Sequence, residues 1–245
     1  YSRNLKEAVF SIEDFVFTED CYFRVLLKKA DGNWCIEEDA GRINEILSFH
    51  SSLPPEESLN SPKLCFGMEI QKTADTVLKK LTEGEALVFG LLTDSHYVVN
   101  GTWGDTLANI NAVNDKVGFD GLIHLGDLQD GMLDKKMCRR IATKCISDMR
   151  HICEPLYMVI GNHDTNYFKG NTEWLTEAEQ YGLYGRFMGN YVCREKQNGW
   201  YYVDYSKHGL RMIFLSSFNH REEVRYGFPE EEIFWVKRVL KATPS

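Results

Sequence analysis

The sequence predicts an α/β protein in which helices flank a mostly parallel sheet. Three short apolar runs, each typical of a buried strand, alternate with stretches of helical character between residues 86 and 160. Each strand–helix unit has the length of a right-handed βαβ crossover, about 30 residues. The carboxyl ends of these strands should therefore lie along one edge, where open α/β sheets place their functional sites.

The first half of this pattern begins with a predicted helix over residues 68–81, where good helix formers precede Gly84. The run ALVFGLLT at 86–93 is continuously apolar, which predicts a strand buried on both faces. A helix over 106–117 and a second strand over 121–126 follow.

The second half continues the alternation with a helix over 134–150, whose apolar residues recur on one face while Lys and Arg occupy the other. A third strand is predicted over 155–160, and helix and loop over 172–190. Two β-rich runs predict a hairpin over 200–217. The stretch 229–241 predicts a helix, because it has proline at its start, acids in the first turn and bases in the last.

The N-terminal stretch differs in character, which predicts two parts in the chain. CYFRVLLKK at 21–29 is a strand candidate, and the Ser-, Pro- and Glu-rich segment 51–62 indicates a linker. We therefore expect a small, mainly β accessory module over 1–66 and the α/β domain over 67–245.

Composition limits the classes of partner. The formal net charge of −8 argues against general nucleic-acid binding, which needs a basic face. No apolar run is long enough to predict a membrane span. The seven cysteines form no CxxC pair and favour reduced thiols of a cytoplasmic protein. A removed signal peptide stays an alternative, because the chain begins at Tyr1 rather than Met.

Polar motifs follow each predicted strand: DSH at 94–96, GDLQDG at 126–131 and GNHD at 161–164. Since they lie one βα repeat apart, we expect them to converge at one edge of the sheet. Their mixture of carboxylate, imidazole and amide donors suits Mn²⁺, Fe or Zn²⁺.

These residue types allow a centre with two metal ions. Asp94 and His96, two positions apart, can both turn toward one ion. Asp127 can bridge two ions through its two oxygens, and Asn162 can offer its carbonyl oxygen to the second. Two ions ~3.5–4 Å apart are a known arrangement for phosphoryl chemistry.

The three motifs, in this order and at this spacing, resemble the first three motifs of the calcineurin-like metallophosphoesterases, D-x-H, G-D-x-x-D and G-N-H-D/E. The stretch FWVKRVL at 234–240 resembles the Trp-Leu helix of that family. The resemblance covers roughly residues 85–245. It implies a layered metallophosphoesterase-type sheet with flanking helices and two divalent metal ions bound by Asp94, His96, Asp127 and Asn162.

The resemblance also implies roles beyond the ligands. His163 would protonate the leaving alkoxide or stabilise charge on the phosphoryl oxygens. Asp164 would orient His163, and Asp130 would hold one of the ligands in place. His220 follows a predicted strand, and we assign it to the substrate pocket.

Two further motifs of that family, a lone His and Gly-His-x-His, follow the Trp-Leu helix, whereas the sequence given ends at Ser245. We therefore expect the 67–245 domain to be C-terminally incomplete. The predicted activity is hydrolysis of a phosphate mono- or diester, with a small phosphoester as substrate. The alternatives are a nuclease of the same family and a catalytically degenerate binding or scaffold protein.

Overall fold

The computed structural model describes residues 26–28, 34–36, 61–167, 171–189, 191–218 and 226–242. Its helices and strands are, in chain order, β1 (Leu26–Lys28), β2 (Trp34–Ile36), α3 (Gly67–Leu81), β3 (Phe89–Leu92), α4 (Tyr97–Asn100), α5 (Trp103–Val117), β4 (Gly121–His124), α6 (Lys135–Ile152), β5 (Leu156–Met158), α7 (Glu177–Gln180), β6 (Tyr201–Tyr205), β7 (Leu210–Phe214) and α8 (Glu230–Lys241). Single turns of 3₁₀ or π-helix lie between several of them.

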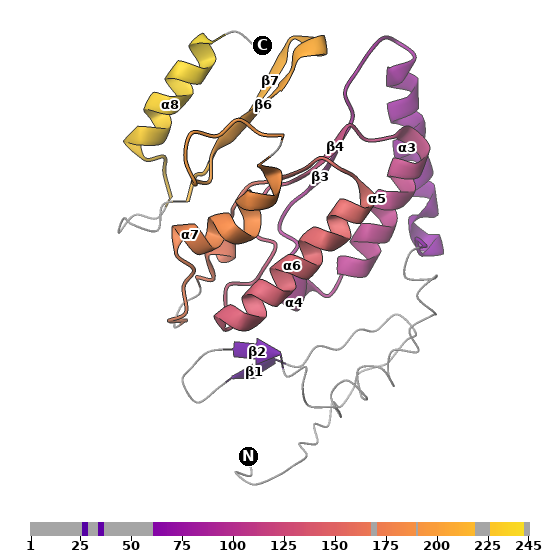
Figure 1. Cartoon of the computed structure of the whole chain (residues 1–245). Coiled ribbons are helices and arrows are strands. Elements are labelled where there is room, and N and C mark those ends of the chain that lie inside the picture. The colour runs from indigo at the N-terminus through magenta and orange to yellow at the C-terminus, as the bar shows by residue number, and fades with distance from the viewer. Residues whose placement is uncertain are drawn as a thin grey trace, which may run out of the picture.

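A parallel sheet of three strands, in the order β3-β4-β5, forms the centre of the α/β domain (Figure 1). Its register pairs Leu92 with His124 and His124 with Met158, so the carboxyl ends of the strands lie side by side. The predicted α/β class and parallel pairing are confirmed.

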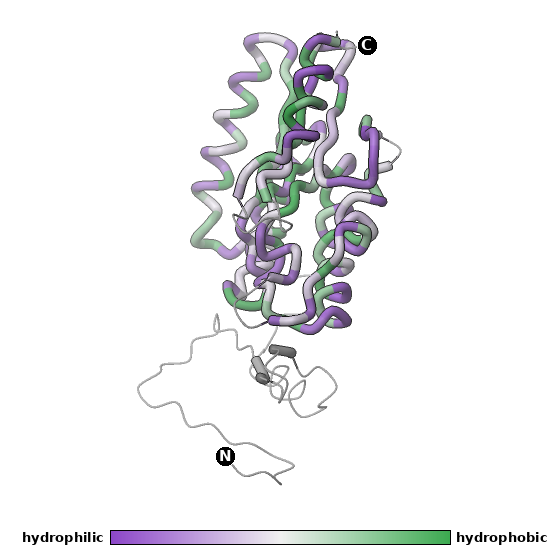
Figure 2. The backbone as a smooth tube through the Cα atoms, turned by 90° about the vertical axis from the view of Figure 1, so that its left-hand side faces the viewer, coloured by the Kyte–Doolittle hydropathy of each residue, from purple (hydrophilic) through white to green (hydrophobic). Residues whose placement is uncertain are grey.

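Three helices, α3, α5 and α6, lie next to one another beside this sheet (Figure 1). The residue before helix α6, Asp134, is its N-cap, and its side chain accepts the backbone N–H of Met137. One face of α6 is buried as its periodicity predicted, and polar and apolar residues alternate around the turns of the helices (Figure 2).

The hairpin of β6 and β7 is antiparallel, as predicted, and packs against β5. The Tyr201 hydroxyl donates to the main-chain oxygen of Met158 at 2.9 Å, and its ring stacks on Phe214 with centroids 4.6 Å apart. Helix α8 lies along the hairpin, because Arg211 on β7 donates to the main-chain oxygens of Val239 and Ala242 at the end of this helix (Figure 1).

Strand β3 departs from the prediction of burial on both faces. Leu91 exposes 58% of its surface, whereas all residues of β4 are buried. The two strands differ in position: β3 is at the edge of the described sheet with one hydrogen-bonded neighbour, and β4 is in the centre with two. A continuous apolar run does not distinguish an edge strand from a central one.

In the N-terminal part, β1 pairs antiparallel with β2, in line with the β character predicted there. Most of residues 1–60 lie outside the described residues, so the division at residue 66 stays a prediction. None of the helices in the described ranges combines the length and apolar composition that a membrane crossing requires.

Candidate metal centre

The loops that follow β3 and β4 run side by side beyond the ends of the strands. The backbone N–H of Asp94 donates to Gly126 O, and that of His96 donates to Asp127 O, each at 3.0 Å. These bonds continue the parallel pairing of β3 and β4 into the loops. The first two motifs are thereby brought together, as their spacing predicted.

Three residues of these loops have left-handed backbone conformations. The φ angles are +48° at Asp94, +39° at His96 and +53° at Asp127. Such conformations cost about 1–3 kcal/mol each for residues other than glycine, and they concentrate at functional sites. Three of the four candidate ligands therefore have this less favourable backbone conformation, whereas the fourth, Asn162, is right-handed with a φ of −67°.

Two glycines let the third motif approach the second. A Cβ atom on Gly126 would lie 2.4 Å from the nitrogen of Gly161, and one on Gly161 would lie 2.1 Å from Asp127 Oδ1. Both contacts are shorter than any side chain tolerates, so only glycine permits this approach. The GNHD loop consequently packs directly against the carboxylate of Asp127.

Donor atoms of Asp94, His96 and Asp127 lie within 4.8 Å of one another. His96 Nε2 is 3.8 Å from Asp94 Oδ1 and 3.9 Å from Asp127 Oδ2. Two carboxylate oxygens and one imidazole nitrogen converging on one point form a donor set that fits a divalent transition-metal ion. This group is a candidate metal site made by the ends of two neighbouring parallel strands.

Asp130 lies beneath this group and is 2% exposed. Its carboxylate accepts the backbone N–H groups of Val98 (2.8 Å) and Val99 (3.3 Å) at the start of α4, and its Oδ1 lies 3.5 Å from His96 Nδ1. Burial raises the pKa of the Asp130 carboxyl, while these N–H donors and His96 lower it. Asp130 is thus placed to orient the imidazole of His96.

His163 lies beside His96, with the two rings edge to face and their centroids 5.1 Å apart. Its Nδ1 is 2.9 Å from the main-chain oxygen of Asp130. A carbonyl only accepts, so this bond puts the proton of the neutral ring on Nδ1 and the lone pair on Nε2. The backbone N–H of His163 donates to Asp127 Oδ1 at 2.9 Å.

Asp164 makes contacts other than the one expected from the resemblance. Its fully buried carboxylate accepts backbone N–H groups of four residues: Asp127 (2.8 Å), Leu128 (3.0 Å), Gln129 (3.3 Å) and Gly161 (2.9 Å). These bonds tie the second motif to the third rather than orienting His163. Burial raises the pKa of Asp164 to about 7, although the N–H donors lower it.

The structure does not test the predicted roles of two site residues, Asn162 and His220. Asn162 is partly buried in the loop that contacts Asp127, and its main-chain oxygen accepts the hydroxyl of Thr165 at 2.8 Å. Its role as a ligand stays a prediction. His220 lies outside the described residues, so its assignment to the substrate pocket also stays a prediction.

The sequence did not single out Asn100, which supports the first motif. Its side-chain amide donates to the main-chain oxygens of Asp94 and Ser95, each at 3.2 Å. The side chain reaches back five and six residues along an irregular loop. The spacing of residues in the sequence does not predict such a contact. It fixes carbonyl groups that the strained loop would otherwise leave to solvent.

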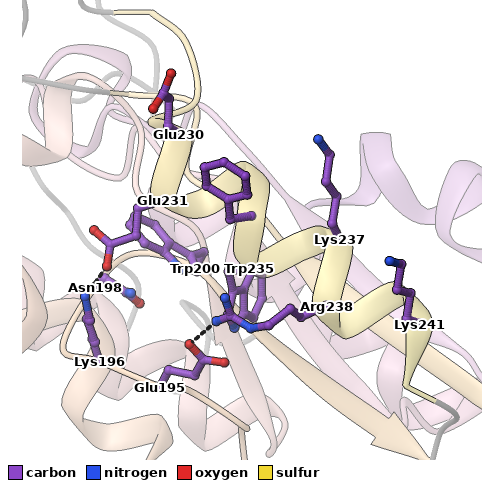
Figure 3. Close-up of a pocket in the computed structure, with 11 residues that line it drawn as sticks. Glu195, Lys196, Asn198, Trp200, Glu230, Glu231, Trp235, Lys237, Arg238 and Lys241 are labelled. Carbon is purple, nitrogen blue, oxygen red and sulfur yellow. Dashed lines mark hydrogen bonds and ion pairs between the residues drawn. The ribbon is translucent and has the colours of Figure 1, made fainter.

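A separate cavity of about 830 Å³ lies between α8 and the loop 195–200 (Figure 3). Four of its charged side chains form two ion pairs: Arg238 lies 2.6 Å from Glu195, and Lys196 pairs with Glu231 (Figure 3). None of its lining residues belongs to the three motifs. We therefore keep the group of Asp94, His96 and Asp127 as the candidate site.

The comparisons with known proteins agree with this geometry. The family model described as Calcineurin-like phosphoesterase matches residues 87–242, more than half of the chain and the part that contains all three motifs. No curated protein and no solved structure gives a significant match. The chain belongs to the calcineurin-like phosphoesterase family.

Proposed function

We propose that this protein hydrolyses a phosphate mono- or diester with the help of two divalent metal ions. One observation carries the proposal: in a member of a phosphoesterase family, Asp94, His96 and Asp127 bring their donor atoms within 4.8 Å at the edge of the parallel sheet. That edge is where open α/β sheets bind their ligands.

Asp94, His96 and Asp127 would hold the first ion, and Asp127 and Asn162 would contribute to the second. Oxygen donors with one imidazole favour Mn²⁺, Fe or Zn²⁺. Bound ions of this kind stabilise negative charge on phosphoryl oxygens and lower the pKa of water. Asp127 is suited to a bridging role, because its Oδ2 faces His96 while its Oδ1 accepts the N–H of His163 in the third motif.

His163 would handle the proton of the leaving group. In ester hydrolysis water adds to phosphorus, the bond from phosphorus to the leaving oxygen breaks, and that oxygen takes up a proton. The bond from Nδ1–H to Asp130 O fixes the ring beside His96. In the protonated imidazole the second proton is on Nε2, and this N–H would pass its proton to the leaving oxygen or donate a hydrogen bond to a phosphoryl oxygen.

The proposed substrate is a small phosphoester, and a cavity of about 430 Å³ adjoins the third motif, although no candidate ligand lines it. Ile160, which directly precedes the GNHD motif, lines it together with Trp200 and Ser216. Its volume lies in the range of pockets for small organic ligands, about 300–1,000 Å³. Its lysine, Lys196, is paired with Glu231, so the cavity offers little attraction to a polyanionic strand.

Hydrolysis of p-nitrophenyl phosphate and bis-p-nitrophenyl phosphate by the full chain, with added Mn²⁺ and then with chelator, tests the proposal. We expect Mn²⁺-dependent turnover of at least one ester and its loss in Asp127→Asn. Turnover that is the same with chelator, or the same in Asp127→Asn, would contradict a metal-dependent reaction at this site.

A further inference from the structure

His124 is an imidazole at the end of the central strand β4, with 0% of its surface exposed. The backbone N–H of Gly126 donates to its Nδ1 at 3.2 Å, so Nδ1 carries the lone pair. The proton of the neutral ring is therefore on Nε2, which lies 2.8 Å from the hydroxyl oxygen of Ser95. This geometry makes Nε2–H the donor and Ser95 Oγ the acceptor.

Ser95 lies between two candidate ligands, Asp94 and His96, both in left-handed conformations. A bond to its side chain therefore acts on the backbone that aims both ligand side chains. His124 belongs to the strand that leads, three residues later, to the third ligand, Asp127. One hydrogen bond thus couples the first ligand loop to the strand that supplies the bridging carboxylate.

A buried imidazole is costly in the middle of a sheet unless both nitrogens are satisfied. Burial lowers the pKa of His124 to about 4, so the ring is neutral near pH 7, with one donor and one acceptor. Both are used, one on Gly126 in the second loop and the other on Ser95 in the first. An apolar side chain would fill the same space without this requirement, but it would not connect the two loops.

We infer that His124 is a positioning residue for the metal centre: through Ser95 it holds the strained loop of Asp94 and His96 at the distance from Asp127 that lets the three donors share one cation. The inference rests on the proposed function in that it assumes a metal ion at this group. It assigns His124 a role in metal affinity beyond packing in the core.

A double-mutant cycle on the full chain tests this coupling, with Mn²⁺ affinity measured by titration calorimetry. Ser95→Ala and His124→Leu should each weaken Mn²⁺ binding by about 10-fold, in the range for groups that orient metal ligands. The double variant should bind no more weakly than the single variants, because both changes remove the same hydrogen bond. His124→Gln, which retains an N–H donor, should recover affinity toward the wild-type value.

Ile123→Val is the matched packing control, since Ile123 precedes His124 on the same buried strand and points to the opposite face. It should leave Mn²⁺ affinity unchanged, and the visible absorption of bound Co²⁺ should change in Ser95→Ala but not in Ile123→Val. If His124→Leu fails to fold, Ser95→Ala and His124→Gln still decide the question.

Different results would overturn the positioning role of His124 and the proposed metal centre. Equal Mn²⁺ affinity in the wild type, Ser95→Ala and His124→Gln would overturn the positioning role and leave the metal centre standing. Additive losses in the double variant would also overturn it, because the two residues would then act separately. A wild-type chain that binds neither Mn²⁺ nor Co²⁺ would overturn both this inference and the proposed function.

Discussion

Asp130 Oδ1 lies 3.5 Å from Nδ1 of His96, on the side of the ring opposite to Nε2. His96 Nε2 points at the carboxylates of Asp94 and Asp127. A carboxylate behind a ligand imidazole fixes its tautomer and ring orientation and raises its basicity. The metal affinity of the site should therefore depend on a buried residue that does not touch the ion.

Asp130→Asn should weaken metal binding by about 10–100-fold, because the amide orients His96 less well and carries no charge. Titration calorimetry with Mn²⁺ measures this effect. Asp120→Asn is the matched control: Asp120 accepts the backbone N–H of Val88 at 2.7 Å at the other end of the sheet. An equal loss in both variants would show that Asp130 acts through general stability alone.

His163→Ala should lower kcat by about 10²–10⁴-fold, the range for loss of a general acid or base, while the metal content stays unchanged. The backbone N–H that binds Asp127 survives the substitution, which separates the two effects. Steady-state kinetics with metal analysis of the same samples measure both. His151→Ala, at an exposed position on α6, serves as the control, and a kcat as high as that of the control would exclude His163 from the chemistry.

Asp164→Ala should destabilise the fold, because it leaves four backbone N–H groups without their shared acceptor. An ordinary hydrogen bond contributes about 0.5–1.5 kcal/mol, so the loss of four should lower the free energy of unfolding by at least about 2 kcal/mol. Guanidinium chloride denaturation measures it, with the exposed Asp115→Ala as control. A midpoint equal to that of the control would mean that Asp164 does not tie the two loops together.

The sequence predicted the α/β class and the convergence of the first two motifs, because both depend on periodicity and on the parallel βα repeat. Asp94, His96 and Asp127 follow strands whose order along the chain is also their order in the sheet. When strand order in the chain and in the sheet agree, sequence spacing is enough to predict which strand ends meet.

The hydrogen-bond partners of Asp164 and His124 could not be predicted from sequence spacing. Both depend on where a buried polar side chain finds its partner, which the folded backbone decides rather than the residue pattern. Asp164 was expected to face its neighbour His163, yet its carboxylate turns to the N–H groups of a loop more than 30 residues away. His124 lies within the predicted strand 121–126, and only its hydrogen bond to Ser95 indicates a role beyond packing in the core.

Glu232 on α8 gives the fold a dependence on pH. Its side chain is 0% exposed, its Oε1 accepts the backbone N–H of Ser216 at 2.7 Å, and its Oε2 has no hydrogen-bond partner among the described residues. Burial raises its pKa from 4.5 to about 7, against the lowering effect of the Ser216 N–H. The folded state therefore binds a proton here more tightly than the unfolded state.

Because the folded pKa is the higher one, this group's contribution to stability is complete below about pH 4.5 and declines as the pH rises toward about 7. Glu232→Gln should remove that decline, so the variant should gain stability relative to the wild type between pH 5 and pH 8. Denaturation at both pH values measures the difference. Glu231→Gln, on the same helix, should keep the wild-type pH dependence, and an identical pH profile for Glu232→Gln would refute the assignment.

The most direct measurement is anomalous X-ray scattering from crystals of the chain grown with Zn²⁺. We predict a zinc peak bonded to Asp94, His96 and Asp127, with Zn–N and Zn–O distances of about 2.0–2.2 Å. A peak bonded to other residues, or no peak at these three side chains in a well-ordered crystal, would contradict a shared cation at the end of the parallel strands.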